Sequence, residues 1–288
     1  MDPTIIGLMC AFSTGLLFGL HDVSVRLSRL RSAGSGVLLS LAAGYPIILL
    51  LALLLGGFQL LSLKALMFYV LAGVINFSVG RASMYIAISR LGASVASILM
   101  STSVVYNLAL GLLLGEDVGL ARVTGSILVL LAVILTVRGG GEIRGFDLAG
   151  LTAGLLAGFS VALSILLGRL GNIESGNPIA GVLVAYTSGL VAEVILVGFR
   201  EGLGAGGLRS STSYPIVLAG VLASLGQAAR YVALMYVGVS VVTPLQNTRP
   251  IVATLVSSLL SERTGERLNP SLALSAVLAL IGSSLVVA

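Results

Sequence analysis

The sequence predicts an all-α integral membrane protein with ten transmembrane helices, arranged as two inverted five-helix repeats. Three observations carry this prediction: an apolar composition, ten apolar runs long enough to cross a membrane, and a similarity between the two halves of the chain. Of the 288 residues, 57% are hydrophobic and 9% are charged, whereas soluble domains carry about 25% charged residues. The composition therefore excludes an ordinary soluble domain.

The charged and reactive residues exclude several other classes of protein. The net charge is +5, but the basic residues stand singly between apolar runs, so we expect no nucleic-acid partner. The single cysteine, Cys10, excludes an internal disulfide. The chain has one histidine and no H-E-x-x-H, Walker or C-x-x-C motif. The sequence therefore predicts no enzyme, no metal site and no cofactor.

Each apolar run approaches the length of about 20 residues that a helix needs to cross the hydrocarbon core. The runs should be helical because lipid offers the backbone no hydrogen-bond partners. In chain order, the predicted spans are roughly 4–24, 35–58, 64–89, 93–115, 119–138, 147–170, 178–199, 214–237, 240–261 and 269–287. Short linkers make consecutive helices antiparallel neighbours. The polar linker 139–146 divides the chain into a first repeat, 1–138, and a second, 147–288.

The two halves share an ordered set of glycine, tyrosine, threonine and charged residues. When Gly80 is placed on Gly226, the alignment also pairs Tyr85 with Tyr231, Gly92 with Gly238, Thr102 with Thr248 and Glu116 with Glu262. Near the repeat starts, placing Gly7 on Gly150 pairs Gly15 with Gly158 and Arg26 with Arg169. Five helices per repeat is an odd number, so the second repeat must enter the bilayer from the opposite side, as in secondary transporters.

A longer pattern recurs at the ends of the spans that carry Tyr85 and Tyr231. Each has a tyrosine segment, a glycine turn, a Ser/Thr-rich start and an apolar run that closes on Glu116 or Glu262, both interpreted as helix caps. This pattern resembles the EamA domain of the drug/metabolite transporter superfamily, in two tandem copies that cover nearly the whole chain. The resemblance implies a carrier of small metabolites with a central cavity between helices 1, 3, 4, 6, 8 and 9. Val104 stands opposite Pro250, so we expect helix 4 to kink less than helix 9, or to kink by other means such as Gly111.

Polar residues inside the apolar runs are the candidate site. An arginine at mid-bilayer costs about 2.5–3.5 kcal/mol and is functional by default. The structural alternative is an arginine paired within the bundle or bonded to the carbonyl groups of a kink. The candidate substrate-binding residues are Arg230, Arg249, Gln227, Tyr231, Gln246, Asn247, Arg81, Tyr85 and Asn107.

Acidic residues near the spans are candidates for coupling or gating. Glu193 is the one acid well inside a predicted span, and it could pair with an arginine, carry a proton, or reach water from a misplaced span. His21 and Asp22 could gate or couple protons, or form a local contact at a helix end. Pro250 is the candidate hinge because proline removes a backbone donor.

The leading hypothesis is a secondary transporter that moves small polar metabolites, anionic or zwitterionic, amino acid-like or phosphorylated, by alternating access. Three buried arginines against one glutamate favour an anion. The alternative is a non-transporting scaffold or receptor-like bundle. The expected partners are a small-molecule substrate and the lipid bilayer, in a monomer of the plasma membrane. The positive-inside rule places the termini outside, whereas the resembled family usually has them in the cytoplasm, so the orientation stays open.

Overall fold

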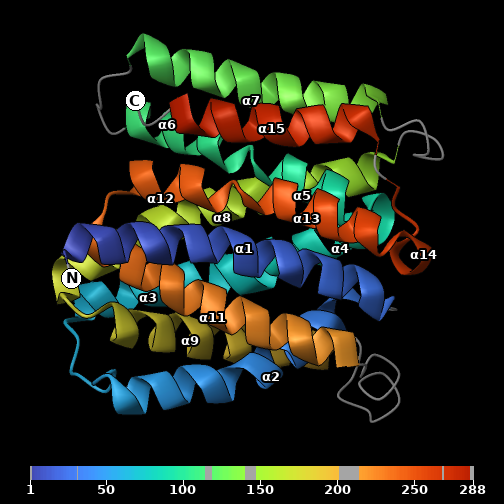
Figure 1. The fold of residues 1–288 in the computed structure, drawn as a ribbon. Helices are drawn as coiled ribbons and strands as arrows, with labels where there is room; N and C mark the ends of the chain where they lie inside the picture. Colours follow the sequence, from blue (N-terminus) through green and yellow to red (C-terminus); the bar gives the residue numbers. More distant parts are fainter. Residues whose placement is uncertain are drawn as a thin grey trace.

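The computed structural model describes residues 2–30, 32–113, 119–139, 147–200, 214–267 and 269–285, whose helices lie side by side as one bundle (Figure 1). The elements of the first half are α1 (Pro3–Ser28), α2 (Ala33–Leu54), α3 (Leu63–Val74), the π-helix η1 (Ile75–Arg81), α4 (Ala82–Leu91), α5 (Ala93–Met100), α6 (Ser103–Leu113) and α7 (Leu120–Gly139). Those of the second half are α8 (Leu148–Ser175), α9 (Pro178–Arg200), α11 (Tyr214–Tyr236), α12 (Val239–Gln246), α13 (Arg249–Leu259), α14 (Ser261–Thr264) and α15 (Pro270–Leu285).

The predicted fold class is confirmed. Among the described residues, 8 helices or helix runs are long and apolar enough to cross a membrane. The two remaining predicted spans contain the shorter apolar helices Arg249–Leu259 and Pro270–Leu285. α1 begins at the end of the bundle where α15 ends (Figure 1), as an even number of crossings requires. The boundaries of the linker 139–146 stay a prediction, since its residues after Gly139 lie outside the described ranges.

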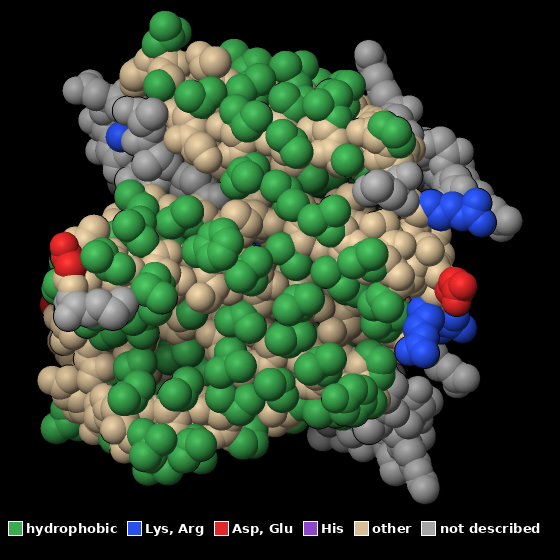
Figure 2. Space-filling view, in the orientation of Figure 1, with side chains coloured by type: hydrophobic (Ala, Val, Ile, Leu, Met, Phe, Trp, Pro, Cys, Tyr) green, Lys and Arg blue, Asp and Glu red, His purple; other side chains and the backbone are tan. Residues whose placement is uncertain are grey.

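The outer surface is that of a protein surrounded by lipid. Figure 2 shows apolar side chains over the middle of the bundle, with Lys, Arg, Asp and Glu side chains near its two ends. Large apolar side chains such as Phe199 and Leu259 are more than 80% exposed. A soluble monomer would not leave so much contiguous apolar surface in contact with water.

The two halves interlock through their first helices. α1 packs against α11, α12 and α13 of the second half, while α8 packs against α3, η1, α4, α5 and α6 of the first half. The outer helices close the bundle at opposite edges: α7 pairs with α15, and α2 pairs with α9 (Figure 1). The first helix of each repeat, α1 or α8, therefore packs against the third and fourth spans of the other repeat.

Both repeats break their fourth helix at the same place. α5 gives way to α6 at Ser101–Thr102, and α12 gives way to α13 at the equivalent Asn247–Thr248. Helix 4 is therefore interrupted without a proline, at Ser101–Thr102 and not at Gly111, while its bend relative to helix 9 stays a prediction. The Thr102 hydroxyl donates to the Leu99 carbonyl at 2.7 Å, and the Thr248 hydroxyl donates to the Leu245 carbonyl at 2.9 Å. These threonine bonds occur at both breaks, and in the first repeat the break forms without a proline.

Glycines allow the first helices to approach these breaks. A Cβ atom at Gly15 on α1 would overlap the Thr248 hydroxyl and lie 2.8 Å from the Leu245 carbonyl oxygen. A Cβ atom at Gly158 on α8 would overlap the Thr102 hydroxyl in the same way. Gly15 and Gly158 are repeat equivalents, so the same close contact is built twice, once across each interface between the halves.

Glutamate capping occurs at a different residue from the predicted one. Glu266 accepts from the backbone N–H groups of Ala93 at 2.7 Å and Ser94 at 3.0 Å, at the start of α5. Gly92 precedes this start with φ 89°, and its missing side chain leaves room for the Glu266 carboxylate. Glu262 instead is exposed in the first turn of α14, and Glu116 lies outside the described residues.

The start of α8 is fixed by Asp147, whose carboxylate accepts from the Gly150 N–H at 2.9 Å and from Arg90 at 3.1 Å. The Gly150 bond, followed by the Arg90 guanidinium, lowers the pKa of Asp147, because both favour the ionised carboxylate. This carboxylate therefore fixes the entry of the second repeat at the membrane surface.

We expect Gly15→Ala and Gly158→Ala each to lower the free energy of unfolding by about 1–3 kcal/mol, the usual cost of overpacking. Unfolding of the purified protein in detergent would measure the loss. Gly119→Ala is the matched control, because a Cβ atom there meets nothing within 4 Å. Unchanged stability in both interface variants would show that these helix contacts are loose.

Candidate substrate-binding site

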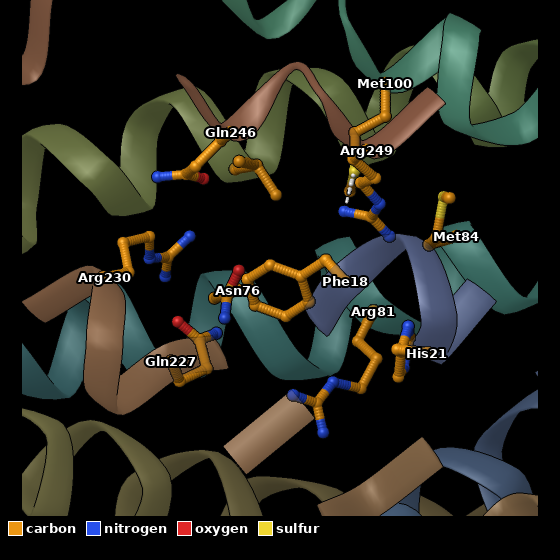
Figure 3. A pocket seen from close by; sticks show the side chains of 11 residues that line it. Phe18, His21, Asn76, Arg81, Met84, Met100, Gln227, Arg230, Gln246 and Arg249 are labelled. Carbon is orange, nitrogen blue, oxygen red and sulfur yellow. Dashed lines mark hydrogen bonds between the residues drawn. The ribbon is translucent and has the colours of Figure 1, made fainter. Parts of the chain in front are cut away.

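A small cavity lies at the centre of the bundle, between the two halves. Its volume is about 40 Å³, and one water needs about 10–15 Å³ measured in this way, so it has room for only a few waters. Side chains from α1, η1, α4, α5, α8, α11, α12 and α13 surround it, which are the six spans predicted to form the central cavity. The lining residues are Phe18, His21, Asn76, Arg81, Met84, Met100, Val161, Gln227, Arg230, Gln246 and Arg249 (Figure 3).

The cavity wall follows the internal repeat. The alignment that places Gly80 on Gly226 also pairs Arg81 with Gln227, Met84 with Arg230 and Met100 with Gln246, and all six residues line the cavity. The alignment of the repeat starts pairs Phe18 with Val161, which also line it. Equivalent positions of both repeats therefore face the same space, as at the midplane site of inverted-repeat transporters. The charges do not follow the repeat, because the residue aligned with each arginine in the other repeat is neutral.

Arg249 forms a two-pronged ion pair with Asp22 of α1. Its Nε donates to Oδ2 at 2.5 Å, and its Nη2 donates to Oδ1 at 2.5 Å. The Asp22 side chain is fully buried and also accepts from the Ser97 hydroxyl of α5 at 2.6 Å. Asp22 thus neutralises Arg249, a pairing that the sequence did not predict, and the count of one buried acid against three arginines is wrong.

The helix break places the Arg249 guanidinium in the cavity. Arg249 is the first residue of α13, and Pro250 occupies the first turn, where a missing N–H leaves no helix bond unmade. Nη1 lies 2.6 Å from Met100 Sδ, and the guanidinium carbon lies 5.2 Å from the Phe18 ring centre (Figure 3). The arginine therefore links α13 to both α1 and α5.

His21 extends this ion pair across the bundle. Its Nδ1 lies 2.9 Å from Asp22 Oδ1, and its Nε2 lies 3.2 Å from the Tyr85 hydroxyl of α4. A carboxylate only accepts, so Nδ1 carries a proton and, in the neutral ring, Nε2 accepts from Tyr85. His21, Asp22, Tyr85 and Arg249 therefore form one continuous layer of hydrogen bonds.

Arg81 and Arg230 are buried without a carboxylate partner among the described residues. Arg81 ends the π-helix η1, a rare feature that is frequent at functional sites, and is 6% exposed. Its guanidinium lies 4.6 Å from the Phe77 ring centre and has one hydrogen bond among the described residues, 3.5 Å long, to the Ser40 hydroxyl. Arg230 is 2% exposed, and its guanidinium lies 6.0 Å from the Tyr231 ring centre.

Buried polar atoms with no partner collect around this cavity. Four of its lining side chains have such an atom in the part of the chain that the structure describes: Arg81 Nη2, Arg230 Nε, Gln227 Oε1 and Gln246 Nε2. Buried polar groups in native structures are almost always bonded, and the exceptions call for a ligand, an ion or water. The arrangement therefore offers two free cationic donors and two amides to a small polar molecule.

Four further predicted residues are not among the lining residues of this cavity. Asn247 donates to the Ser283 hydroxyl at 2.5 Å and lines a neighbouring cavity of about 20 Å³, which shares five lining residues with the central one. The Tyr231 ring packs against Tyr69, Asn107 lies half-buried on α6, and Glu193 is buried on α9. None of these four is among the lining residues, so helical spacing alone did not identify the cavity face.

Phe18, Asn76, Met84 and Met100 line the cavity but were not predicted as site residues. Met84 and Met100 are the repeat equivalents of Arg230 and Gln246, so carrying each candidate across the repeat would have found them. Asn76 is five residues before Arg81, and the π-helix places both among its buried residues. Ordinary helical spacing gives no signal for that arrangement.

Comparison with known proteins agrees with this architecture. The profile of the EamA-like transporter family matches residues 5–138 and 148–288. A crystal structure of a protein with 14% sequence identity superposes with a TM-score of 0.68, covering 99% of this chain and 96% of that one, which shows a shared fold. A search of curated proteins found no match. Since the family profile matches twice and covers nearly all of the sequence, the chain belongs to the EamA-like transporter family, a non-enzymatic family of multi-pass membrane transporters.

Proposed function

We propose that this protein is a secondary transporter of small anionic or zwitterionic metabolites, working by alternating access in the plasma membrane. The single observation that carries the proposal is the pair of buried guanidinium groups, Arg81 and Arg230, that face the central cavity without a carboxylate in the described residues. A membrane protein keeps such groups where they meet a substrate or a water-filled path.

The sign of the charge supports an anionic substrate group. Three arginines line the cavity, and Asp22 neutralises Arg249, so Arg81 and Arg230 remain as positive charges. Low-dielectric walls focus the field of these charges and favour a negative ligand. A guanidinium presents a planar fork that fits a carboxylate or phosphate through two hydrogen bonds. An amino acid-like or phosphorylated metabolite has the matching chemistry.

The neutral lining residues complete the proposed site. Gln227 and Gln246 each have one unbonded side-chain atom beside the cavity, so they supply an acceptor and a donor to the rest of the substrate. The cavity of about 40 Å³ is smaller than such a molecule, so this conformation corresponds to a contracted, substrate-free state. Opening would have to move at least one of the helices that line it.

Arg249 serves as a ligand only after it leaves Asp22. In the contracted state both oxygens of Asp22 are bonded to Arg249. A substrate anion can take the place of Asp22, and Asp22 then needs another cation or a proton. This exchange gives Asp22 and its neighbour His21 a direct route to coupling or gating. Glu193 stays a candidate proton carrier, although it lies on α9 and is not among the residues that line the cavity.

The first test is the sign of the substrate. In proteoliposomes, anionic and zwitterionic solutes should enter faster than cationic ones. Arg81→Lys and Arg230→Lys should slow uptake of the best anion at least about tenfold, since a hydrogen bond to a charged group contributes about 1.5–3 kcal/mol. Arg249→Lys should slow it as well, while the exposed Arg90→Lys serves as the control. A preference for cations, or unchanged anion uptake in all three cavity variants, would refute the proposal.

The second test concerns the Asp22–Arg249 pair. Asp22→Asn should lower the free energy of unfolding by about 3–5 kcal/mol, because it leaves a buried charge without its partner. The double variant Asp22→Asn/Arg249→Gln should lose less than the sum of the single changes, as measured by unfolding in detergent. Asp147→Asn, at a water-exposed pair, is the control and should change stability little, because asparagine keeps an oxygen that accepts from the Gly150 N–H. Additive losses would show that the two side chains do not interact.

The third test assigns the coupling residue. We expect Glu193→Gln to retain accumulation driven by a pH gradient at the wild-type level, because Glu193 is not among the residues lining the cavity. Uptake would be followed in vesicles with an imposed gradient, with counterflow exchange as the reference in the same preparation. Loss of gradient-driven uptake with exchange intact would instead identify Glu193 as the proton carrier.

A further inference from the structure

A second and larger hollow opens at the end of the bundle where α1 ends. Its volume is about 440 Å³, within the range of about 300–1,000 Å³ that is usual for small-molecule sites. The last turn of α1, the end of α4 and the helix α14 surround it. We call this hollow the vestibule. It lies at the end of the bundle opposite the start of α1 (Figure 1).

The vestibule carries an excess of positive charge. Arg26, Arg29 and Arg263 line it, against one acid, Glu262. Arg26 is engaged: it donates to the carbonyl groups of Thr264 and two residues of α4, and its Nε lies 3.6 Å from Glu266. Arg29 and Arg263 are exposed and form no ion pair within the described ranges of the chain. Two free guanidinium groups therefore remain at the rim.

Arg29 occupies an unusual backbone conformation. It caps α1 in the left-handed region with φ 49° and is the one non-glycine residue with positive φ among those the structure describes. Glycine or asparagine normally takes such a cap, and a larger residue is strained there. This conformation places a long cationic side chain at the mouth of the hollow, where a glycine would leave none.

One layer of side chains divides the vestibule from the central cavity. Tyr85 lines the vestibule, and His21 lines the central cavity. Their side chains meet at 3.2 Å between the Tyr85 hydroxyl and His21 Nε2, and Asp22 holds the other nitrogen of His21. A solute that rests in the vestibule is therefore one hydrogen-bonded layer away from the arginines of the central cavity.

We propose that the vestibule is an outer binding site for a carboxylate- or phosphate-bearing anion, held by Arg29 and Arg263 on its way to or from the central cavity. The assignment rests on the proposed function, since the same substrate passes both sites. The anion would rest against the Tyr85–His21 layer while that layer is closed. The phosphate of an anionic lipid offers the same chemistry from a second source.

A charged thiol reagent tests the vestibule without knowledge of the substrate. Ser89, which lines it, is changed by Ser89→Cys in a Cys10→Ser background, in nanodiscs of phosphatidylcholine. Sulfonate-bearing and trimethylammonium-bearing methanethiosulfonates are compared, each relative to its rate with a free thiol. The sulfonate reagent should react about tenfold faster, as a focused positive field requires, and inorganic phosphate and acetate should slow it.

The double variant Arg29→Gln/Arg263→Gln should abolish both the preference and the protection. Arg90→Gln is the matched control, because Arg90 is an exposed arginine near the vestibule that pairs with Asp147 instead and should leave both unchanged. Equal relative rates of the two reagents, no protection by phosphate, or an unaltered double variant would each overturn the proposal. Protection by added phosphatidylglycerol but not by soluble phosphate would assign the vestibule to a lipid headgroup and also overturn it.

Labelling of the vestibule and transport of solutes test the vestibule site and the proposed function independently. Arg230→Lys should reduce transport but leave the labelling of the vestibule unchanged, since Arg230 lines the central cavity only. A wild-type preference for cationic solutes in proteoliposomes would refute the proposed function and leave the labelling result intact. Loss of the reagent preference with normal anion uptake would refute the vestibule site alone.

Discussion

The burial of the Arg249 guanidinium beside the fully buried Asp22 carboxylate is the constraint on which the centre of this bundle depends. Neither charge can face lipid, and removing either partner of such a pair costs several kcal/mol. The geometry of the pair requires α1, α5 and α13 to meet, because Asp22 bonds both Arg249 and Ser97. It also requires α13 to begin at Arg249, which the break after Gln246 provides. The helix break, the close approach at Gly15 and the ion pair are therefore parts of one arrangement.

The scaffold follows the internal repeat, whereas the charges do not. Gly15 and Gly158 make the same contact, and Arg26 and Arg169 donate to the equivalent carbonyl groups of Ile88 and Leu234. The equivalents of Arg249 and Asp22, by contrast, are Ser103 and Ile165. A symmetric scaffold gives a carrier two related conformations, one open to each side. Under the proposed alternating access, charges in only one of the two equivalent places would make those conformations differ in energy, and the substrate would meet a different site from each side.

Most of the fold could be predicted from the sequence because the bilayer leaves the backbone so few choices. Apolar runs must be helices of membrane-crossing length, and α1, α9 and α11 match their predicted ranges to within a few residues. The break in helix 4 was not located because the prediction considered proline and Gly111, while the threonine bonds at Thr102 and Thr248 occur at both breaks. The lining of the central cavity was predicted in part, because Arg81 and Arg230 are recognisable in the sequence as charged residues within apolar runs. The partner of Arg249 could not be predicted, since Asp22 appeared to lie near a helix end, and only the α1–α13 packing joins residues so far apart in sequence.

The electrostatics on which the proposed anionic substrate rests also bear on how the cavity opens. In the contracted state the central cavity is closed toward the vestibule by Tyr85 and His21, and His21 is held by Asp22, which is itself held by Arg249. Opening this layer with the cavity empty would separate Asp22 from Arg249 and leave two buried charges unpaired, which is costly in a low-dielectric interior. The proposed anionic substrate would remove part of that cost, because it would supply Arg249 with a new partner when Asp22 departs. A ligand shifts a conformational equilibrium only by its difference in affinity for the two states, and in the proposed mechanism that difference would come from the charge that the substrate carries to Arg249.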